Sequence, residues 1–146
     1  MIIKECTTEL LNEIKIQKGQ IKDALMVEFG SIPAEMLSKY SLALEIRGSV
    51  VGAVGLFPLW EGVGAGWALF SEGAMDKHWL SISRAVKEML DAEIKLRDYR
   101  RVETVVDVSF VRAQNWAEWL GFEIEGISRN YGNGGSGDFY RYARII

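Results

Sequence analysis

The sequence predicts a single domain of the mixed α/β class, in which strands and helices alternate along the chain. Three observations lead to this prediction. From residue 41 to residue 70, short β-favouring runs are separated by glycine. After Asp76, apolar residues recur at helical spacing, and residues 102–108 then form a valine-rich run that is typical of a buried strand. A chain of 146 residues is long enough to bury one core, so one domain is expected.

The N-terminal segment is expected to hold one short strand and one or two helices. Residues 1–6 fit an opening strand, and Thr7 or Thr8 is suited to cap the helix that follows. Gly19 is expected to interrupt the helical region, and residues 30–33, with their glycine and proline, are expected to close it. The apolar positions at loosely helical spacing are Leu10, Leu11, Ile14, Ile21, Leu25 and Phe29.

Three antiparallel strands are predicted next, because the texture changes to short β-favouring runs between glycines. Residues 47–49 suit a tight hairpin between the first two strands. Residues 58–65 are predicted to form a looser connection before the third strand, with Trp60 at its tip. The predicted strands cover residues 41–46, 50–56 and 66–70.

A long helix is predicted after the third of these strands. Asp76 is suited to cap its N-terminus, since a carboxylate accepts hydrogen bonds from the first N–H groups of a helix. Residues 97–100 are expected to form the turn that leads into the valine-rich strand. The apolar stripe that should face a sheet is Trp79, Ile82, Val86, Met89 and Ile94.

The C-terminal part is predicted as a short helix followed by a closing hairpin. Residues 112–120 fit the helix, which should end at Gly121 because glycine readily adopts the left-handed conformation at a helix C-terminus. Residues 122–127 and 138–145 fit the two strands of the hairpin.

Composition argues against several classes of function. Apolar residues make up 49% of the chain and charged residues 25%, as in ordinary globular proteins. The net charge is −3 and no basic run exceeds Arg100 and Arg101, so nucleic acid is not an expected ligand. The single cysteine, Cys6, is expected to be buried, and with one histidine it makes no metal site. No signal-peptide pattern or membrane-spanning run occurs, so a cytoplasmic protein is expected.

Two stretches resemble a known family. Residues 113–126 place a Leu-Gly-Phe junction, Leu120 to Phe122, between a helix and a strand, and residues 138–143 suit a last strand. With the order of elements, they resemble the GNAT (GCN5-related N-acetyltransferase) superfamily over essentially the whole chain. The resemblance implies a mixed, mostly antiparallel sheet of six or seven strands, with helices on both faces and a splay between strands 4 and 5. A narrower resemblance is to small acetyltransferase-like proteins of tailed phages, including an internal virion protein of short-tailed phages.

The resemblance also implies acetyl-CoA as a co-substrate. In the family, the pantetheine arm pairs with the splayed strands, and the N-terminus of the long helix receives the pyrophosphate through its unpaired N–H groups. The family motif (Gln or Arg, two residues, Gly, one residue, Gly or Ala) aligns with residues 78–83, so serine replaces both glycines. The cofactor-binding residues that the resemblance implies are Leu69, Phe70, Ser71, Lys77, His78, Ser81, Ser83, Arg84 and Phe110.

Acyl transfer from a thioester to an amine needs a base for the ammonium proton and an acid for the thiolate, but no covalent enzyme nucleophile. The family often uses a tyrosine as the acid, and Ala117 occupies its position here. Glu72, after the fourth strand, is the candidate base, and Ser109, after the fifth, is the candidate donor. Each has a simpler alternative, since a loop glutamate can be merely solvated and a serine often only stabilises a turn.

Four other residues leave alternatives open. Asp107 must be paired if its side chain points inward, and belongs to the polar face if it points outward. His78 is assigned to phosphate contact or to plain solvent exposure rather than to proton transfer. Trp116 and Trp119 suit either the lining of an acceptor pocket or, as is commoner for aromatics three apart on a helix, core packing.

Two functions follow from these observations. The first is an acetyl-CoA-dependent N-acetyltransferase that acts on a primary amine of a small molecule or protein, in the cytoplasm, or in the host cytoplasm if a phage encodes it. The second is a non-catalytic protein of the same fold that acts as a virion component or binding module, because serine replaces the glycines and the tyrosine is missing. Fold does not decide between them. Neither nucleic acid nor a membrane is an expected partner, and a homodimer stays open.

Overall fold

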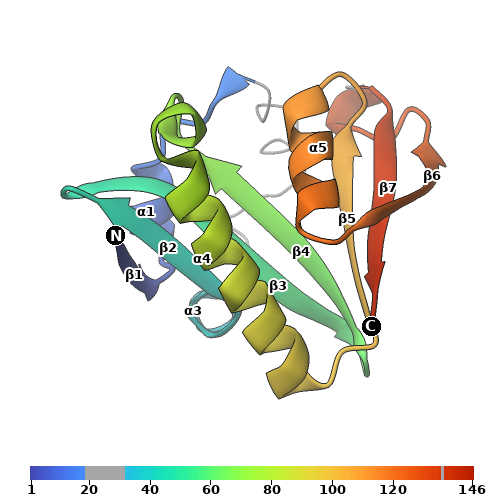
Figure 1. The fold of residues 1–146 in the computed structure, drawn as a ribbon, viewed down its shortest axis with the longest axis horizontal. Helices are drawn as coiled ribbons and strands as arrows, with labels where there is room; N and C mark the ends of the chain where they lie inside the picture. Colours follow the sequence, from blue (N-terminus) through green and yellow to red (C-terminus); the bar gives the residue numbers. More distant parts are fainter. Residues whose placement is uncertain (19–31, 136) are drawn as a thin grey trace.

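The computed structural model describes residues 1–18, 32–135 and 137–146, and its centre is one seven-stranded sheet. The strand order is β1-β2-β3-β4-β5-β7-β6, and only the β4–β5 pair is parallel. Helices α4 and α5 lie in front of the sheet in Figure 1, and α1 and α3 lie behind it. The mixed, mostly antiparallel sheet with helices on both faces, expected from the sequence, is therefore confirmed.

The N-terminal segment begins as predicted. Strand β1 covers Ile2–Glu5 and helix α1 covers Thr8–Asn12. Thr7 caps α1, because its side-chain oxygen accepts a hydrogen bond of 3.2 Å from the Leu10 N–H. Helix α3, Ala34–Tyr40, was not predicted, since seven residues after a proline carry little periodic signal. The predictions for Gly19, Ile21, Leu25, Phe29, Gly30 and Ser31 lie outside the described residues.

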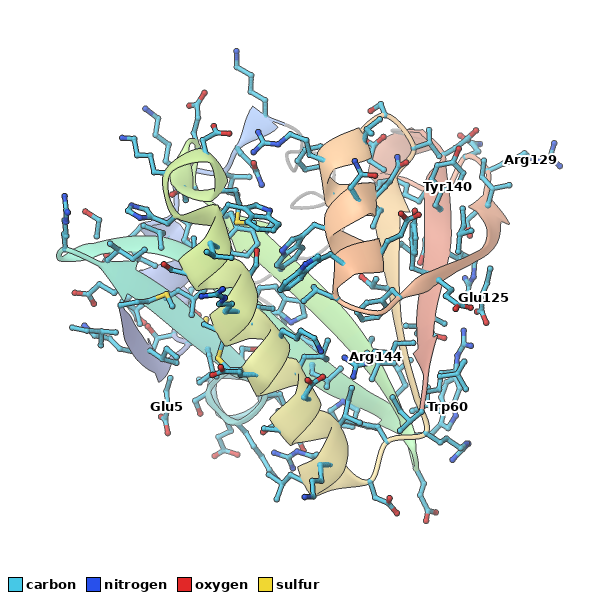
Figure 2. The ribbon with its side chains drawn as sticks, in the orientation of Figure 1. Glu5, Trp60, Glu125, Arg129, Tyr140 and Arg144 are labelled. Carbon is cyan, nitrogen blue, oxygen red and sulfur yellow. The ribbon has the colours of Figure 1, made fainter. Side chains whose placement is uncertain are left out.

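The three central strands pair as an antiparallel meander, but two of them are longer than predicted. Strand β2 covers Ser41–Ile46, β3 covers Ser49–Trp60 and β4 covers Val63–Phe70. The looser connection expected over residues 58–65 is therefore wrong. A shift of register between Pro58 and Trp60 lets β3 continue through a proline, which cannot donate a ladder hydrogen bond. Trp60 projects at the hairpin tip, 62% exposed, near the lower end of the molecule (Figure 2).

Helix α4 covers Ala74–Arg97 and begins earlier than the sequence predicted. Gly73, with φ of 78°, occupies the N-cap, so the assignment of that role to Asp76 is wrong. Glycine adopts this left-handed conformation without the steric cost that a side chain imposes. His78 has non-helical angles (φ −127°, ψ 22°), so a short first turn precedes a kink and the main helix starts at residue 79.

The C-terminal elements match the predicted order. Strand β5 covers Arg101–Asp107 and helix α5 covers Val111–Trp119. Gly121, with φ of 97°, follows the helix as expected. The closing hairpin pairs β6, Glu123–Ser128, with β7, Phe139–Ile145, and β7 also pairs with β5.

The sheet separates two clusters of buried apolar side chains. The larger cluster packs α4 and α5 on the sheet and includes Ile82, Val86 and Ile94 from the predicted stripe. The smaller cluster lies under α1 and α3 and contains Cys6, which is fully buried as expected. Burial raises the pKa of the Cys6 thiol to about 11, so the thiol stays protonated at neutral pH. Among the described residues, no helix is both long and apolar enough to cross a membrane.

Candidate active site

The central feature of the site is the point at which β4 and β5 separate. Their parallel ladder contains the pairs Val63 with Arg101, Gly64 with Val102 and Ala65 with Glu103, and it stops there. Beyond this point β4 continues to Phe70 and β5 to Asp107 without registering with each other. The splay between strands 4 and 5 that the sequence predicted is therefore present.

A cavity of about 490 Å³ lies at this splay. Small side chains from β4 line it, including Ala65, Gly66 and Ala68, and β5 contributes Thr104 and Val106. The side chains that cover it from α4 and α5 are mostly apolar. Its volume is in the range of sites for small ligands. Helices α4 and α5, which contribute to its wall, are visible on either side of the splay in Figure 1. The apolar cavity-lining residues from these two helices and the end of α5 are Val86, Met89, Leu90, Ala113, Trp116, Ala117 and Leu120.

The open end of the splay holds a short stretch of the protein's own chain, residues 15–17. The Gln17 N–H donates to the Phe70 carbonyl at 3.1 Å, and the Glu72 N–H donates to the Lys15 carbonyl at 2.8 Å. The Ser71 N–H donates to Val51 of β3. Because the carbonyl and N–H of one trans peptide point in opposite directions, the Phe70 carbonyl points to the β5 side. Residues 15–17 therefore pair with the edge of β4 that faces the splay.

Helices α4 and α5 are bridged across the same region. The Trp116 indole N–H donates to the Ser83 hydroxyl at 3.0 Å, and its ring packs edge-on against Phe70 with centroids 5.3 Å apart. The Trp79 and Trp119 rings also meet, at 5.7 Å. Both tryptophans of α5 thus join the two helices. The ion pair of Arg112 with Asp76, at 2.7 Å, adds little because both side chains are more than half exposed.

The residues predicted to bind the pantetheine arm fall into three places. Leu69 is buried and lines the main cavity. Phe70 and Phe110 instead line a smaller cavity of about 50 Å³ beside Trp116. Ser71 is paired with Ile16 at the open end of the splay. The structure therefore brings one of the four to the main cavity and the others to its outer end.

The residues predicted to bind phosphate surround the kink in α4. Lys77, Ser81 and Arg84 are exposed, and His78 forms the kink itself. Ser81 lies three residues after this kink, near the start of the main part of the helix. Ser83 is different, because it is fully buried and its hydroxyl accepts the hydrogen bond from Trp116. The hydroxyl of Ser83 is thus turned to the interior rather than to a surface where phosphate could dock.

The two predicted catalytic residues lie just past the ends of the separated strands, outside the main cavity. Glu72 follows β4 and is exposed. Ser109 follows β5, and both its N–H and its hydroxyl donate to the Asp107 carboxylate, at 2.8 and 2.7 Å. Asp107 is 3% exposed, so the inward, paired alternative describes it. The Gln114 amide reinforces this turn by donating to the carbonyls of Asp107 and Val108.

The sequence did not single out several polar and aromatic residues that line the cavity. Tyr40, Ser41, Phe57, Trp67 and Tyr131 belong to this wall. They come from α3, β2, β3, β4 and the loop after β6, so no short motif could have grouped them. The one available signal was the concentration of aromatic residues beside glycines in the central strands.

Comparisons with known proteins identify the fold. A ribosomal-protein-alanine N-acetyltransferase from Brucella melitensis superposes with a TM-score of 0.72 and 16% identity, covering 100% of each chain. A mutant of the spermidine N-acetyltransferase from Vibrio cholerae superposes with a TM-score of 0.62 and 17% identity. The match covers 72% of this chain and 64% of the other, so this chain spans less than two thirds of that protein. A microcin self-immunity acetyltransferase, solved with acetyl-CoA and AMP, superposes with a TM-score of 0.62 and 16% identity. The match covers 73% of this chain and 60% of the other.

Further structures with this fold are described as GNAT-family acetyltransferases, so the chain has the GNAT fold. No protein-family model matches the sequence, and a search of curated proteins gives no match either. The narrower resemblance to phage proteins stays a prediction.

Proposed function

We infer that this protein is an acyl-CoA-dependent N-acetyltransferase whose acceptor is a primary amine. The observation that carries this proposal is the end of the β4–β5 ladder at Ala65 and Glu103, with a cavity of about 490 Å³ at the splay. A thioester bound there is reached by an amine from the face opposite α4 and α5. The amine attacks the carbonyl carbon, the carbon–sulfur bond breaks, and the proton lost by nitrogen ends on the sulfur, giving an amide and free CoA.

The residues at the splay fit the narrow arm of acetyl-CoA. Ala65, Gly66 and Ala68 leave the edge of β4 unobstructed by large side chains. At the outer end, the kink at His78 begins the main part of α4, and the positive end of its dipole lies beside Ser81, with Lys77 and Arg84 nearby in sequence. The chain itself supplies these binding features, and the acyl group is the chemistry that acetyl-CoA brings.

The proton transfers are assigned to the residues after the two strands. Glu72 is proposed as the base, acting through a water because it lies outside the cavity. Ser109 is proposed as the donor to sulfur. Since its hydroxyl is held by Asp107 at 2.7 Å, it must rotate away to donate, and Asp107 acts as a positioning residue that sets its orientation.

Calorimetric titration with acetyl-CoA tests the proposal most directly. Saturable binding, followed by transfer of the acetyl group to a primary amine, is the expected result. If no heat of binding is detected at millimolar acetyl-CoA, the chain is not an acetyltransferase.

Replacing Ser81 by glutamate is expected to abolish acetyl-CoA binding. A carboxylate at this position would repel the pyrophosphate, and it should not unfold the helix because acidic residues stabilise helix N-termini. The matched control is Ser81→Gln, which has the same shape without the charge and should retain binding. Equal affinity of both variants and the wild type, measured by the same titration, would show that the phosphates bind elsewhere.

A second candidate is a non-catalytic protein that keeps the fold, as a virion component or binding module. Two contacts favour it. Residues 15–17 pair with the edge of β4 that the pantetheine arm would use, and Trp116 joins α5 to the buried Ser83 of α4. If the protein is non-catalytic, both contacts are permanent parts of the core, and acetyl-CoA cannot bind at the splay.

Gln17→Pro distinguishes a displaceable segment from a permanent one. Proline has no N–H, so the variant cannot donate to the Phe70 carbonyl. If residues 15–17 compete with acetyl-CoA, the loss of one hydrogen bond, worth about 1 kcal/mol, should raise affinity roughly fivefold. Gln17→Ala keeps the N–H, so this control measures the effect of losing the side chain alone. Unchanged affinity in Gln17→Pro would show that the segment does not compete.

A further inference from the structure

One part of the cavity wall forms an aromatic chamber, which we define by Tyr40, Ser41, Phe57 and Trp67. Phe57 and Trp67 pack against the apolar cluster on the α1 and α3 side of the sheet, opposite α4 and α5. Ring centroids are 6.3 Å apart between Tyr40 and Phe57 and 6.0 Å apart between Phe57 and Trp67. Three rings in series thus line one side of a space that reaches the splay.

Gly55 holds this arrangement in place. A Cβ built at Gly55 would lie 2.2 Å from the Trp67 indole nitrogen and 2.5 Å from a neighbouring ring carbon. The indole of Trp67 therefore lies directly over the backbone of β3, where any larger residue would displace it. The rings are inclined to one another, by 88° between Tyr40 and Phe57 and by 43° between Phe57 and Trp67. The Trp67 indole is thus one ring held in a fixed position, and a fixed aromatic ring suits stacking with a planar group.

The chamber also holds a buried hydroxyl with an unmet hydrogen-bonding requirement. Ser41 is 3% exposed and lines the cavity, and its Oγ has no hydrogen-bond partner among the described residues. Buried hydroxyl groups are almost always hydrogen-bonded, because leaving one unpaired costs about 1–3 kcal/mol. A ligand group that reaches Ser41 would remove this cost.

The charges at the edge of the chamber are balanced and give no acidic patch for a polycation. Lys39 Nζ lies 5.3 Å from the centroid of the Tyr40 ring, and the Arg97 guanidinium lies 4.9 Å from it. Glu93, which lines the cavity, forms an ion pair of 3.1 Å with Arg97. Of the charged side chains, Lys39 and Glu93 line the cavity, one of each sign, so the described wall has no cluster of carboxylates to hold an acceptor with several ammonium groups.

We propose that the aromatic chamber is the acceptor subsite and takes the ring of an arylalkylamine that bears a hydrogen-bonding ring substituent, which pairs with the Ser41 hydroxyl. The ring stacks beside Trp67 and Phe57, and the alkyl chain carries the amine to the splay. This assignment rests on the proposed function, because it names the class of acceptor for the same site.

Equilibrium binding in the presence of free CoA tests the assignment without turnover. The probes are tyramine, phenethylamine, which lacks the ring hydroxyl, 2-cyclohexylethylamine, which lacks the aromatic ring, and spermidine. Tyramine is expected to bind about tenfold more tightly than phenethylamine, since a site with a buried polar group rejects the analogue that leaves it unpaired. 2-Cyclohexylethylamine should bind more weakly still, and spermidine should not bind measurably.

Ser41→Ala should bind tyramine and phenethylamine equally, with thermal stability equal to or above that of the wild type, because the substitution removes a buried hydroxyl that is unpaired in the free protein. Ser49→Ala, at the exposed first residue of β3, is the matched control and should keep the tenfold preference. Trp67→Leu should weaken both arylamines, and Phe57→Leu serves if that variant fails to fold.

Each outcome decides between the two proposals. If spermidine or 2-cyclohexylethylamine binds as tightly as tyramine, or if Ser41→Ala keeps the preference for tyramine, the acceptor assignment is wrong. Binding of CoA without any arylamine overturns the assignment and leaves the proposed function standing. If tyramine binds but neither CoA nor acetyl-CoA does, the chamber is supported as an arylamine site and the proposed acetyltransferase activity is wrong.

Discussion

Gly66→Leu is expected to weaken acetyl-CoA binding by about fivefold to 150-fold while leaving the protein folded. Gly66 lines the cavity at the first position of β4 beyond its ladder with β5. A Cβ there would meet nothing closer than Val102 Cγ1 at 3.7 Å, so the backbone tolerates a side chain. The rest of the leucine would extend into the space assigned to the pantetheine arm, and overpacking of this kind costs about 1–3 kcal/mol.

The stability of Gly66→Leu should equal or exceed that of the wild type, because glycine in a strand is entropically unfavourable. The matched control is Gly126→Leu, a strand glycine in β6 whose Cβ would have no neighbour within 4 Å. It should bind acetyl-CoA normally. Normal affinity in Gly66→Leu, with chemical denaturation confirming a native fold, would place the cofactor outside the splay.

Phe139→Ala should lower the free energy of unfolding by about 3–5 kcal/mol. Phe139 is fully buried at the start of β7, opposite Asp107 of β5, and its ring packs on Tyr131 at 5.8 Å. Its removal leaves a cavity behind the strand that forms one side of the splay. Urea denaturation measures the change, which is a large share of the 5–15 kcal/mol typical of a domain.

Trp60→Ala provides the contrast, because the Trp60 side chain is 62% exposed at the hairpin tip. A change within about 0.5 kcal/mol is expected there. If Phe139→Ala costs less than about 1 kcal/mol, the packing around β7 relaxes far more than a buried aromatic normally allows.

Local signals predicted most elements of the fold, and the errors have local causes too. Thr7 was found as a cap because its side chain acts on an N–H three residues away. Asp76 has the same chemistry but was misassigned, since a left-handed Gly73 starts the helix earlier. Pro58 was expected to end a strand, and instead a shift of register lets β3 continue past it. Helix α3 is too short to show a period.

The candidate site could be predicted only in part. Motif alignment placed Ser81 and Ser83 together at the phosphate position, because it counts residues along one helix. Ser83 is nevertheless buried against Trp116, which lies 33 residues further along the chain. Glu72 and Ser109 were placed correctly at the strand ends, but Ser109 proves to be held by the buried Asp107. These partners depend on packing, which spacing along the chain does not reveal.

The sequence by itself determined the order of the elements, because caps, turns and periodicity act over a few residues. That order and the Leu-Gly-Phe junction carried the GNAT resemblance, and the resemblance implied the splay. The tertiary structure decided where the β4–β5 ladder stops, that residues 15–17 pair at the open end, and which side chains line the cavity. Ser41 and Trp67 meet in the aromatic chamber only because antiparallel pairing sets β2 and β4 on either side of Gly55. Such contacts join residues that are distant in sequence, and only the register and packing of the folded sheet specify them.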